Sequence, residues 1–399
     1  MHLPSLRIHQ EMYSEDASLW FTLANGDTEE AILLKLPTTS LKAVMQGCSL
    51  DILLSRVNEH LCWCASISDV PEKSLTITGV IRHKEDYEAL VRVLAKVSAP
   101  LFLYNEMDLC VAWSDVTMEP DTAAAARRLV DEKVLSETAP FDAAASAALD
   151  VFGEHLNQEA IDEERGAWNG VKMRVSASDW TTAKIAVAGV NDLKRIDVSS
   201  QDEGLALESL AWSALESVFP FALHHNPQVM EGVKGRELID IVATHEYGSF
   251  LIESKDLAVL RAKPKRTHER RLATLRSHIC KAIAQLNAAA KAVQKGTEVR
   301  AKNGAVIPLN RDHPLHCIVL VTEFIEDDSW VDVFVELCNA AIDRKCFFHV
   351  LDLRELVTML KIAKGRSTHF DYMLMERAKV SVKNAALHVR SRVSTSSAD

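Results

Sequence analysis

The sequence predicts an α/β protein in which a C-terminal mixed sheet flanked by helices follows an α+β N-terminal region. From residue 205 onward, helical patterns alternate with short apolar runs of the kind found in buried strands. Residues 7–118 contain mostly short apolar runs, which indicate strands, with one helical segment among them. The length of 399 residues exceeds that of a typical single hydrophobic core, so we expect two or three domains.

Shifts in composition divide the chain into four expected regions. Residues 1–118 form an N-terminal α/β domain without a chemical motif, and Pro120 marks its end. Residues 119–200 form a connecting region of helix and short strands that ends in a polar stretch. Residues 201–365 form a second folded domain, and residues 366–399 form a basic, partly disordered tail.

The expected elements of the first two regions follow from apolar periodicity. Six runs in residues 1–118 predict strands, and one helical pattern lies among them: strands 19–23, 31–36, 61–66, 75–81, 101–104 and 109–113, and helix 85–97. The connecting region predicts an alanine-rich helix over 121–157, interrupted near Pro140, and then strands over 171–175 and 184–188.

The second domain has a clearer order of elements. The expected order is helix, hairpin, helix, strand, helix, strand, helix: 205–219, 237–244 with 249–255, 268–295, 316–322, 330–341, 347–351 and 353–362. This order is typical of a mixed sheet with helices on its faces.

Charge is distributed unevenly along the chain. The net charge is −11; residues 1–200 hold 18 Lys and Arg against 31 Asp and Glu, and the remainder holds 27 against 25. An acidic surface repels phosphate backbones, so a polyanion is expected to bind the rear half. The acidic front half is then expected to contact a partner protein, sense a trigger or form a homo-oligomer.

No sequence feature indicates a membrane or secretion. No apolar run approaches the roughly 20 residues of a membrane helix, and the N-terminus lacks the pattern of a secretory signal. The eight cysteines are scattered, and the spacing of Cys62 and Cys64 is too tight for a zinc knuckle. We therefore expect a cytoplasmic protein with reduced thiols and no membrane contact.

The hairpin over 237–255 carries the main chemical signal. If its turn is symmetric about Glu246 and Tyr247, Asp240 lies directly across from Glu253. Alternation along the strand places Glu253 and Lys255 on one face, which Asp240 joins as the cross-strand partner. Three charged side chains are thus predicted to converge on an otherwise apolar hairpin.

Paired carboxylates in such a position favour a divalent cation. Two acids at this distance repel each other unless positive charge lies between them. Oxygen ligands favour Mg²⁺, with Mn²⁺ as the alternative. Lys255 would then position the attacking water or offset charge in the transition state, which suits hydrolysis of a phosphodiester. The alternative is an exposed ion pair, the usual role of a Glu-X-Lys on a strand.

The set Asp240…Glu253-Ser254-Lys255 resembles the PD-(D/E)XK motif of the restriction-endonuclease-like nucleases. The resemblance covers roughly the last half of the chain, and Ile239 stands where the motif's name has Pro. It implies a restriction-endonuclease-like mixed sheet and a Mg²⁺-dependent nuclease whose preferred substrate is DNA. Nucleases of this kind with an unfamiliar N-terminal domain often belong to restriction or anti-phage systems, so we expect a role in bacterial defence.

The resemblance also implies roles for three further residues. The carbonyl of Ser254 would help hold the metal, and an acid on the preceding helix would complete the metal site. We assign that acid to Glu208, with Glu216 as the competing acid on the same helix. Gln285 is similar to a catalytic glutamine on the helix after the motif, although its position beside the apolar stripe is equally typical of a surface residue.

A basic segment follows the motif. It contains a run of cations that are candidates for nucleic-acid binding: Arg261, Lys263, Lys265, Arg266, Arg270 and Arg271. Lys and Arg neutralise phosphates without reading sequence, whereas the alternative is a solvated helix face. Two other functions remain open at this point: a catalytically inactive nucleic-acid-binding or scaffold protein with the same fold, and a main function carried by the N-terminal half.

Overall fold

The computed structural model describes residues 4–24, 28–68, 74–159, 170–188, 193–197, 203–231, 234–255, 268–325, 327 and 330–393. Two compact units are present, Met1–Ala183 and Lys184–Asp399. Both combine helices with sheet, as the α/β prediction requires. Within the described ranges, no helix is both long enough and apolar enough to cross a membrane.

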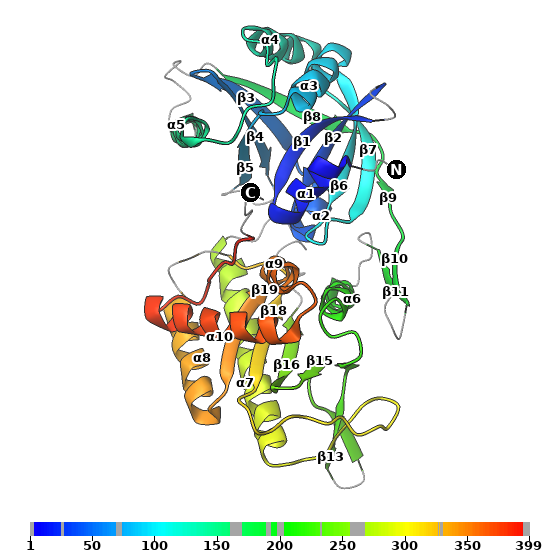
Figure 1. The fold of residues 1–399 in the computed structure, drawn as a ribbon, viewed down its shortest axis with the longest axis vertical. Helices are drawn as coiled ribbons and strands as arrows, with labels where there is room; N and C mark the ends of the chain where they lie inside the picture. The colour runs from blue at the N-terminus through cyan, green and yellow to red at the C-terminus, as the bar shows by residue number, and fades with distance from the viewer. Residues whose placement is uncertain are drawn as a thin grey trace. The chain divides into compact units, whose positions relative to one another are not determined.

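The first unit is built on a nine-stranded sheet (Figure 1). Its strand order is β1-β2-β6-β7-β8-β3-β4-β5, with β9 paired to β7; β2 and β6 are parallel and the other pairs antiparallel. The strands are β1 (Ser18–Ala24), β2 (Glu29–Lys35), β3 (Leu50–Val57), β4 (His60–Ile67), β5 (Leu75–Val80), β6 (Ser98–Tyr104), β7 (Cys110–Thr117), β8 (Gly170–Ala177) and β9 (Thr181–Thr182). All six strands predicted in residues 1–118 are confirmed.

Five helices accompany this sheet in the described residues: α1 (Leu6–Ser14), α2 (Thr38–Met45), α3 (Lys84–Lys96), α4 (Pro120–Asp131) and α5 (Ala143–Glu159). The predicted helix 85–97 and the interrupted alanine-rich helix are confirmed. The sequence did not predict α1, α2 or β3. Strand β3 is buried along most of its length, so its sequence lacks the alternation of polar and apolar residues that predicts a half-buried strand. Its acid, Asp51, is buried because it pairs with Arg174 and Lys172 of β8.

The connecting region expected over 119–200 is not separate. Strand β8 pairs with β3 on one side and with β7 on the other, so it joins the two halves of the first sheet. The boundary between the compact units therefore lies after Ala183 and not at residue 118. The local sequence of such a strand does not indicate its partners, because the strands that it pairs with are far away in sequence.

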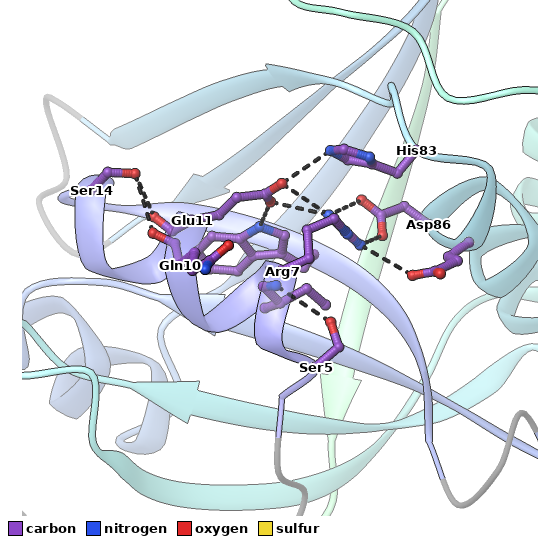
Figure 2. Close-up of polar contacts among 10 residues, drawn as sticks. Ser5, Arg7, Gln10, Glu11, Ser14, His83 and Asp86 are labelled. Atoms are coloured by element: carbon purple, nitrogen blue, oxygen red, sulfur yellow. Dashed lines mark hydrogen bonds and ion pairs between the residues drawn. The ribbon is translucent and has the colours of Figure 1, made fainter. Parts of the chain in front are cut away.

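A partly buried ionic network joins α1 to α3 in the first unit (Figure 2). Arg7 contacts both Glu11 and Asp86, and Glu11 also accepts a hydrogen bond from Trp20 Nε1 at 2.8 Å. Burial alone would raise the pKa of Glu11, but hydrogen bonding from His83 and the charge of Arg7 lower it to about 2. Burial raises the pKa of Asp86 to about 6, against the opposing charge of Arg7. The network therefore serves to fix α1 against α3.

The second unit has a five-stranded mixed sheet of order β12-β15-β16-β18-β19. Its first three strands are antiparallel, and β16, β18 and β19 are parallel. The strands are β12 (Leu223–His225), β15 (Ile241–His245), β16 (Gly248–Lys255), β18 (His316–Val321) and β19 (Phe347–Asp352). The helices are α6 (Glu203–Glu216), α7 (His268–Gln294), α8 (Val331–Arg344), α9 (Leu353–Ala363) and α10 (Ser367–Asn384). The expected order of elements is confirmed.

The two faces of this sheet carry different cores. Because successive residues of a strand point to opposite faces, neighbours on β16 enter different layers. Leu251 packs with the apolar residues of α7 and α8. On the other face, the ring of Phe250 lies 5.2 Å from that of Phe219 and 5.6 Å from that of Phe370 on α10. Strand β16 is thus buried on both faces up to its last two residues.

The strand predicted over 237–244 is divided in the structure. A hairpin of β13 (Gln228–Glu231) and β14 (Lys234–Glu237) leaves the sheet after β12 and pairs with β17 (Val299–Arg300) in a small sheet of its own. A short two-stranded sheet of β10 (Ile185–Ala188) and β11 (Leu193–Ile196) begins the unit. The chain returns to the main sheet at Asp240, whose carbonyl accepts a 2.7 Å hydrogen bond from Asn226 N.

The basic tail expected over 366–399 is largely helical. Residues 367–384 form α10, which buries Phe370, Leu374 and Arg377. Beyond it, Arg390 pairs with Asp352 at the end of β19. Residues 394–399 lie outside the described residues, so the partial disorder of the tail stays a prediction. The helix was not expected, because the basic composition gave no sign that Phe370 and Leu374 would be buried.

A chain of polar contacts fastens α10 to the sheet. His316 Nε2 on β18 lies 2.9 Å from Asp371 Oδ1 of α10, and His316 Nδ1 lies 3.1 Å from His349 Nε2 on β19. Both histidines are about 1 % exposed. Burial holds the pKa of His349 well below its ordinary value, and the neighbouring His316 lowers it further. His349 is therefore neutral in the folded protein.

This lowered pKa predicts a pH-dependent stability. His349 binds a proton in the unfolded chain at an ordinary pKa, whereas in the folded protein it stays neutral. The free energy of unfolding should therefore decrease as the pH falls below about 6.5, with a limiting slope of about 1.4 kcal/mol per pH unit. His349→Phe should flatten this dependence, whereas substitution of the exposed His313 should not. Urea unfolding between pH 5 and 8 measures the slopes, and an unchanged slope in His349→Phe would contradict the assignment.

Candidate active site

The register of the β15–β16 hairpin positions the predicted acids. The ladder runs from His245 opposite Gly248 to Ile241 opposite Ile252, so the turn is the two-residue one expected. Asp240 directly precedes Ile241, and Glu253 directly follows Ile252, the last pair of this ladder. The hairpin thus places both acids just beyond its last pair, at the end of a buried strand.

Asp240 is held by the third residue of the motif. Its Oδ2 accepts hydrogen bonds from Ser254 N at 2.7 Å and from Ser254 Oγ at 2.8 Å. The Ser254 side chain was not assigned a role in the sequence, since only its carbonyl was expected to act. Its two hydrogen bonds fix the Asp240 carboxylate against the edge of β16, in a half-buried position.

Glu253 is the buried member of the pair, with 3 % of its surface exposed. The Lys255 ammonium contacts Glu253 Oε1, and the lysine side chain remains 21 % exposed. Burial raises the pKa of Glu253, and the charge of Asp240 raises it further, while Lys255 lowers it. Lys255 is thus in contact with Glu253, and Asp240 lies near enough for its charge to act on Glu253.

Glu208 lies in the same region but has a partner that the sequence did not reveal. Glu208 Oε2 on α6 lies 3.1 Å from His225 Nε2 on β12, and His225 Nδ1 lies 3.4 Å from Lys302 Nζ. His225 pairs with Ile241, the neighbour of Asp240. Glu208 is therefore one end of a carboxylate–imidazole–ammonium chain beside the paired acids.

A fourth carboxylate, Glu237, connects these groups electrostatically. Burial raises the pKa of Glu237, and the charges of Asp240 and Glu208 raise it further. His225 and Lys302 act in the opposite direction. Four charged or titratable groups therefore lie close enough to act on Glu237, although they come from α6, β12, the segment between β14 and β15, and the turn after β17.

Several expected site residues are elsewhere. Gln285 is exposed on α7, so the surface alternative holds for it. Arg270 is exposed at the start of α7, whereas Arg271 is only 4 % exposed and cannot belong to an open phosphate-binding surface. The α7 core stripe includes the next residue, Leu272, which explains the burial. The four remaining predicted cations lie outside the described residues: Arg261, Lys263, Lys265 and Arg266.

The residues missed by sequence reasoning are His225, Glu237 and Lys302. The only local sign was the adjacent pair His224-His225, which lies in a stretch where the sequence predicts neither helix nor strand. Lys302 belongs to a turn 77 residues after His225, so no spacing could connect the two. Their contact arises because the β13–β14 hairpin pairs with β17.

The carboxylates do not form a ready-made cage for a metal. In the part of the chain that the structure describes, no group of three or more His, Cys, Asp or Glu side chains is arranged to hold a metal ion. Each acid is instead engaged by its own partner: Ser254 for Asp240, Lys255 for Glu253 and His225 for Glu208. Two adjacent carboxylates and a backbone carbonyl nevertheless provide oxygen donors of the kind that Mg²⁺ or Mn²⁺ prefers.

Comparison with known proteins does not extend these observations. No protein-family model, curated protein or solved structure matches the chain.

The Glu253–Lys255 pair predicts a stability effect that grows with pH. Lys255→Met leaves a buried carboxylate without its cation, which should cost about 3 kcal/mol when Glu253 is ionised. Protonation relieves this cost, since the raised pKa means that the folded protein binds the proton more tightly than the unfolded chain. The deficit should therefore be larger at pH 8 than at pH 5.

Urea unfolding of the variant and of wild type at both pH values measures this deficit. The double variant Glu253→Gln/Lys255→Met is the matched control, because it has no carboxylate at position 253 to protonate. Between pH 5 and pH 8, Lys255→Met should therefore lose stability relative to this double variant. An equal deficit at both pH values in Lys255→Met would show that Lys255 does not govern the ionisation of Glu253.

Proposed function

We propose that the second unit is a metal-dependent nuclease that hydrolyses phosphodiester bonds, with DNA as the preferred substrate. The observation that carries this proposal is the grouping of Asp240, Glu253 and Lys255 at the end of β16, where Asp240 accepts hydrogen bonds from Ser254 and Lys255 contacts Glu253. Burial raises the pKa of Glu253 and the charge of Asp240 raises it further, and a divalent cation would offset both effects. The resemblance to PD-(D/E)XK nucleases supports the same assignment.

The order of elements supports a restriction-endonuclease-like fold. A helix precedes three antiparallel strands, and a long helix then leads from β16 to the parallel strand β18. This places the motif residues at the end of a central strand, where parallel neighbours also end. Open sheets of mixed type commonly bind ligands at the carboxyl ends of such strands.

Each residue has a role in the proposed reaction. Asp240, Glu253 and the carbonyl of Ser254 would hold Mg²⁺ or Mn²⁺. When bound, such a cation supplies positive charge against the scissile phosphate and activates water. Lys255 would orient the attacking water from its position beside Glu253, and Ser254 fixes the carboxylate of Asp240. We further propose a cytoplasmic setting in bacterial restriction or anti-phage defence, with partner contact through the acidic first unit.

A second function, binding of nucleic acid without cleavage, is favoured by one observation. Asp240, Glu253 and Glu208 each have a partner within the protein, and the described residues contain no preformed group of three metal ligands. A site that is satisfied in this way could keep its fold and its surface without chemistry. Cleavage assays distinguish the two functions directly.

The decisive assay incubates the purified protein with plasmid, linear duplex DNA, single-stranded DNA and RNA, each with Mg²⁺, Mn²⁺ or EDTA. We expect cleavage with either cation and none with EDTA. Asp240→Asn should reduce the rate by about 100-fold or more, since it removes a charge used in the reaction while its amide oxygen can still accept from Ser254.

Gln285→Ala is the matched control and should cut at the wild-type rate, because Gln285 is exposed on α7. Cleavage that survives in Asp240→Asn and in Lys255→Met would remove the proposed site. Metal-independent binding of nucleic acid without any cleavage would support the second function instead.

A further inference from the structure

The turn after β17 is a well-defined, hydrogen-bonded turn near the candidate active site. It is closed by hydrogen bonds from Gly304 N to Ala301 O and from Ala301 N to Ala305 O, both 2.8 Å. Gly304 adopts a positive φ of +85°, which a glycine tolerates without strain. Arg300 donates to the Gly304 carbonyl at 3.0 Å. The turn therefore presents its tip, Lys302, in a defined position.

The position of Lys302 is set by a neighbour from the main sheet. Its ammonium lies 3.4 Å from His225 Nδ1, and the opposite ring nitrogen of His225 lies 3.1 Å from Glu208 Oε2. Trp212 of α6 packs edge-on against the same imidazole at 5.8 Å. Glu208 and Trp212 thus hold His225, and His225 in turn orients Lys302.

Lys302 differs from the other lysine of the site in how its charge is used. Lys255 is paired with the buried Glu253. Lys302 is exposed, and among the described residues no carboxylate forms an ion pair with it. An exposed ammonium that forms no ion pair with a carboxylate remains able to bind an anion.

We propose that Lys302 binds a backbone phosphate of the nucleic-acid substrate and that the Glu208–His225 pair positions it for this contact. The inference rests on the proposed function, since it names a substrate contact of the same site. A phosphodiester chain carries one negative charge per nucleotide, and fixed cations next to the reacting acids set its path and register. The alternative is that Lys302 only offsets nearby acids such as Glu237.

Binding measurements with charge-changing variants distinguish these roles. Fluorescence anisotropy of labelled duplex and single-stranded DNA is recorded in EDTA and in Ca²⁺, a cation that also takes oxygen ligands, over about 50 to 200 mM salt. Lys302→Ala should weaken binding about 5- to 20-fold and reduce the slope of log K against log salt by about 0.9, the loss of one phosphate contact. Lys302→Arg should restore both.

The matched control is Lys295→Ala, which removes one exposed charge from the same unit, just after α7, and should leave affinity and slope unchanged. If His225 positions Lys302, His225→Ala should weaken DNA binding less than Lys302→Ala does and should leave the slope of log K against log salt unchanged. The substitution His224→Ala at the neighbouring residue should leave the affinity unchanged.

Wild-type protein that binds and cuts DNA while Lys302→Ala matches it in affinity and slope would overturn this inference alone. An equal loss in Lys302→Ala and Lys295→Ala would also overturn it, because the effect would then be one of overall charge. Wild-type protein that neither binds nor cuts any nucleic acid would overturn the proposed function, and the inference with it.

Discussion

The register between β15 and β16 is the constraint on which the candidate site depends. A turn of two residues, Glu246 and Tyr247, sets His245 opposite Gly248 and every later pair with it. A slip of one residue would send Glu253 to the other face of the sheet, where Phe250 packs between Phe219 and Phe370. Burial of β16 on both faces therefore fixes its register, and the same register determines both the core packing and the position of Glu253.

The same hairpin was predictable from the sequence because all its information is local. The turn, the alternation of β16 and the facing position of Asp240 lie within 16 residues of one another. The Glu208–His225–Lys302 chain was not predictable, since it joins three elements through the pairing of β13 with β17. Local periodicity contains no information about which distant strands will become neighbours.

Other differences have the same origin. Arg271 belonged to a basic run that is typical of a solvated face, but the phase of α7 places it beside buried Leu272. The basic tail was expected to be partly disordered, yet Phe370 and Asp371 fasten α10 to the sheet through Phe250 and His316. In both cases composition suggested solvent exposure, and a few apolar or buried residues at helical spacing determined the outcome.

Charge balance connects the two proposals made for the site. The site holds four acids and two lysines. The acids are Glu208, Glu237, Asp240 and Glu253, and the lysines are Lys255 and Lys302. Such a cluster repels a phosphodiester, so substrate can approach closely only if positive charge is added or is already fixed at its edge. A divalent cation between Asp240 and Glu253 would cancel the negative charge that the lysines leave, and Lys302 already presents an exposed ammonium near these acids. The proposed cation is thus needed for substrate binding as well as for the reaction. The acids that would hold the cation are the same groups that would repel the substrate in its absence.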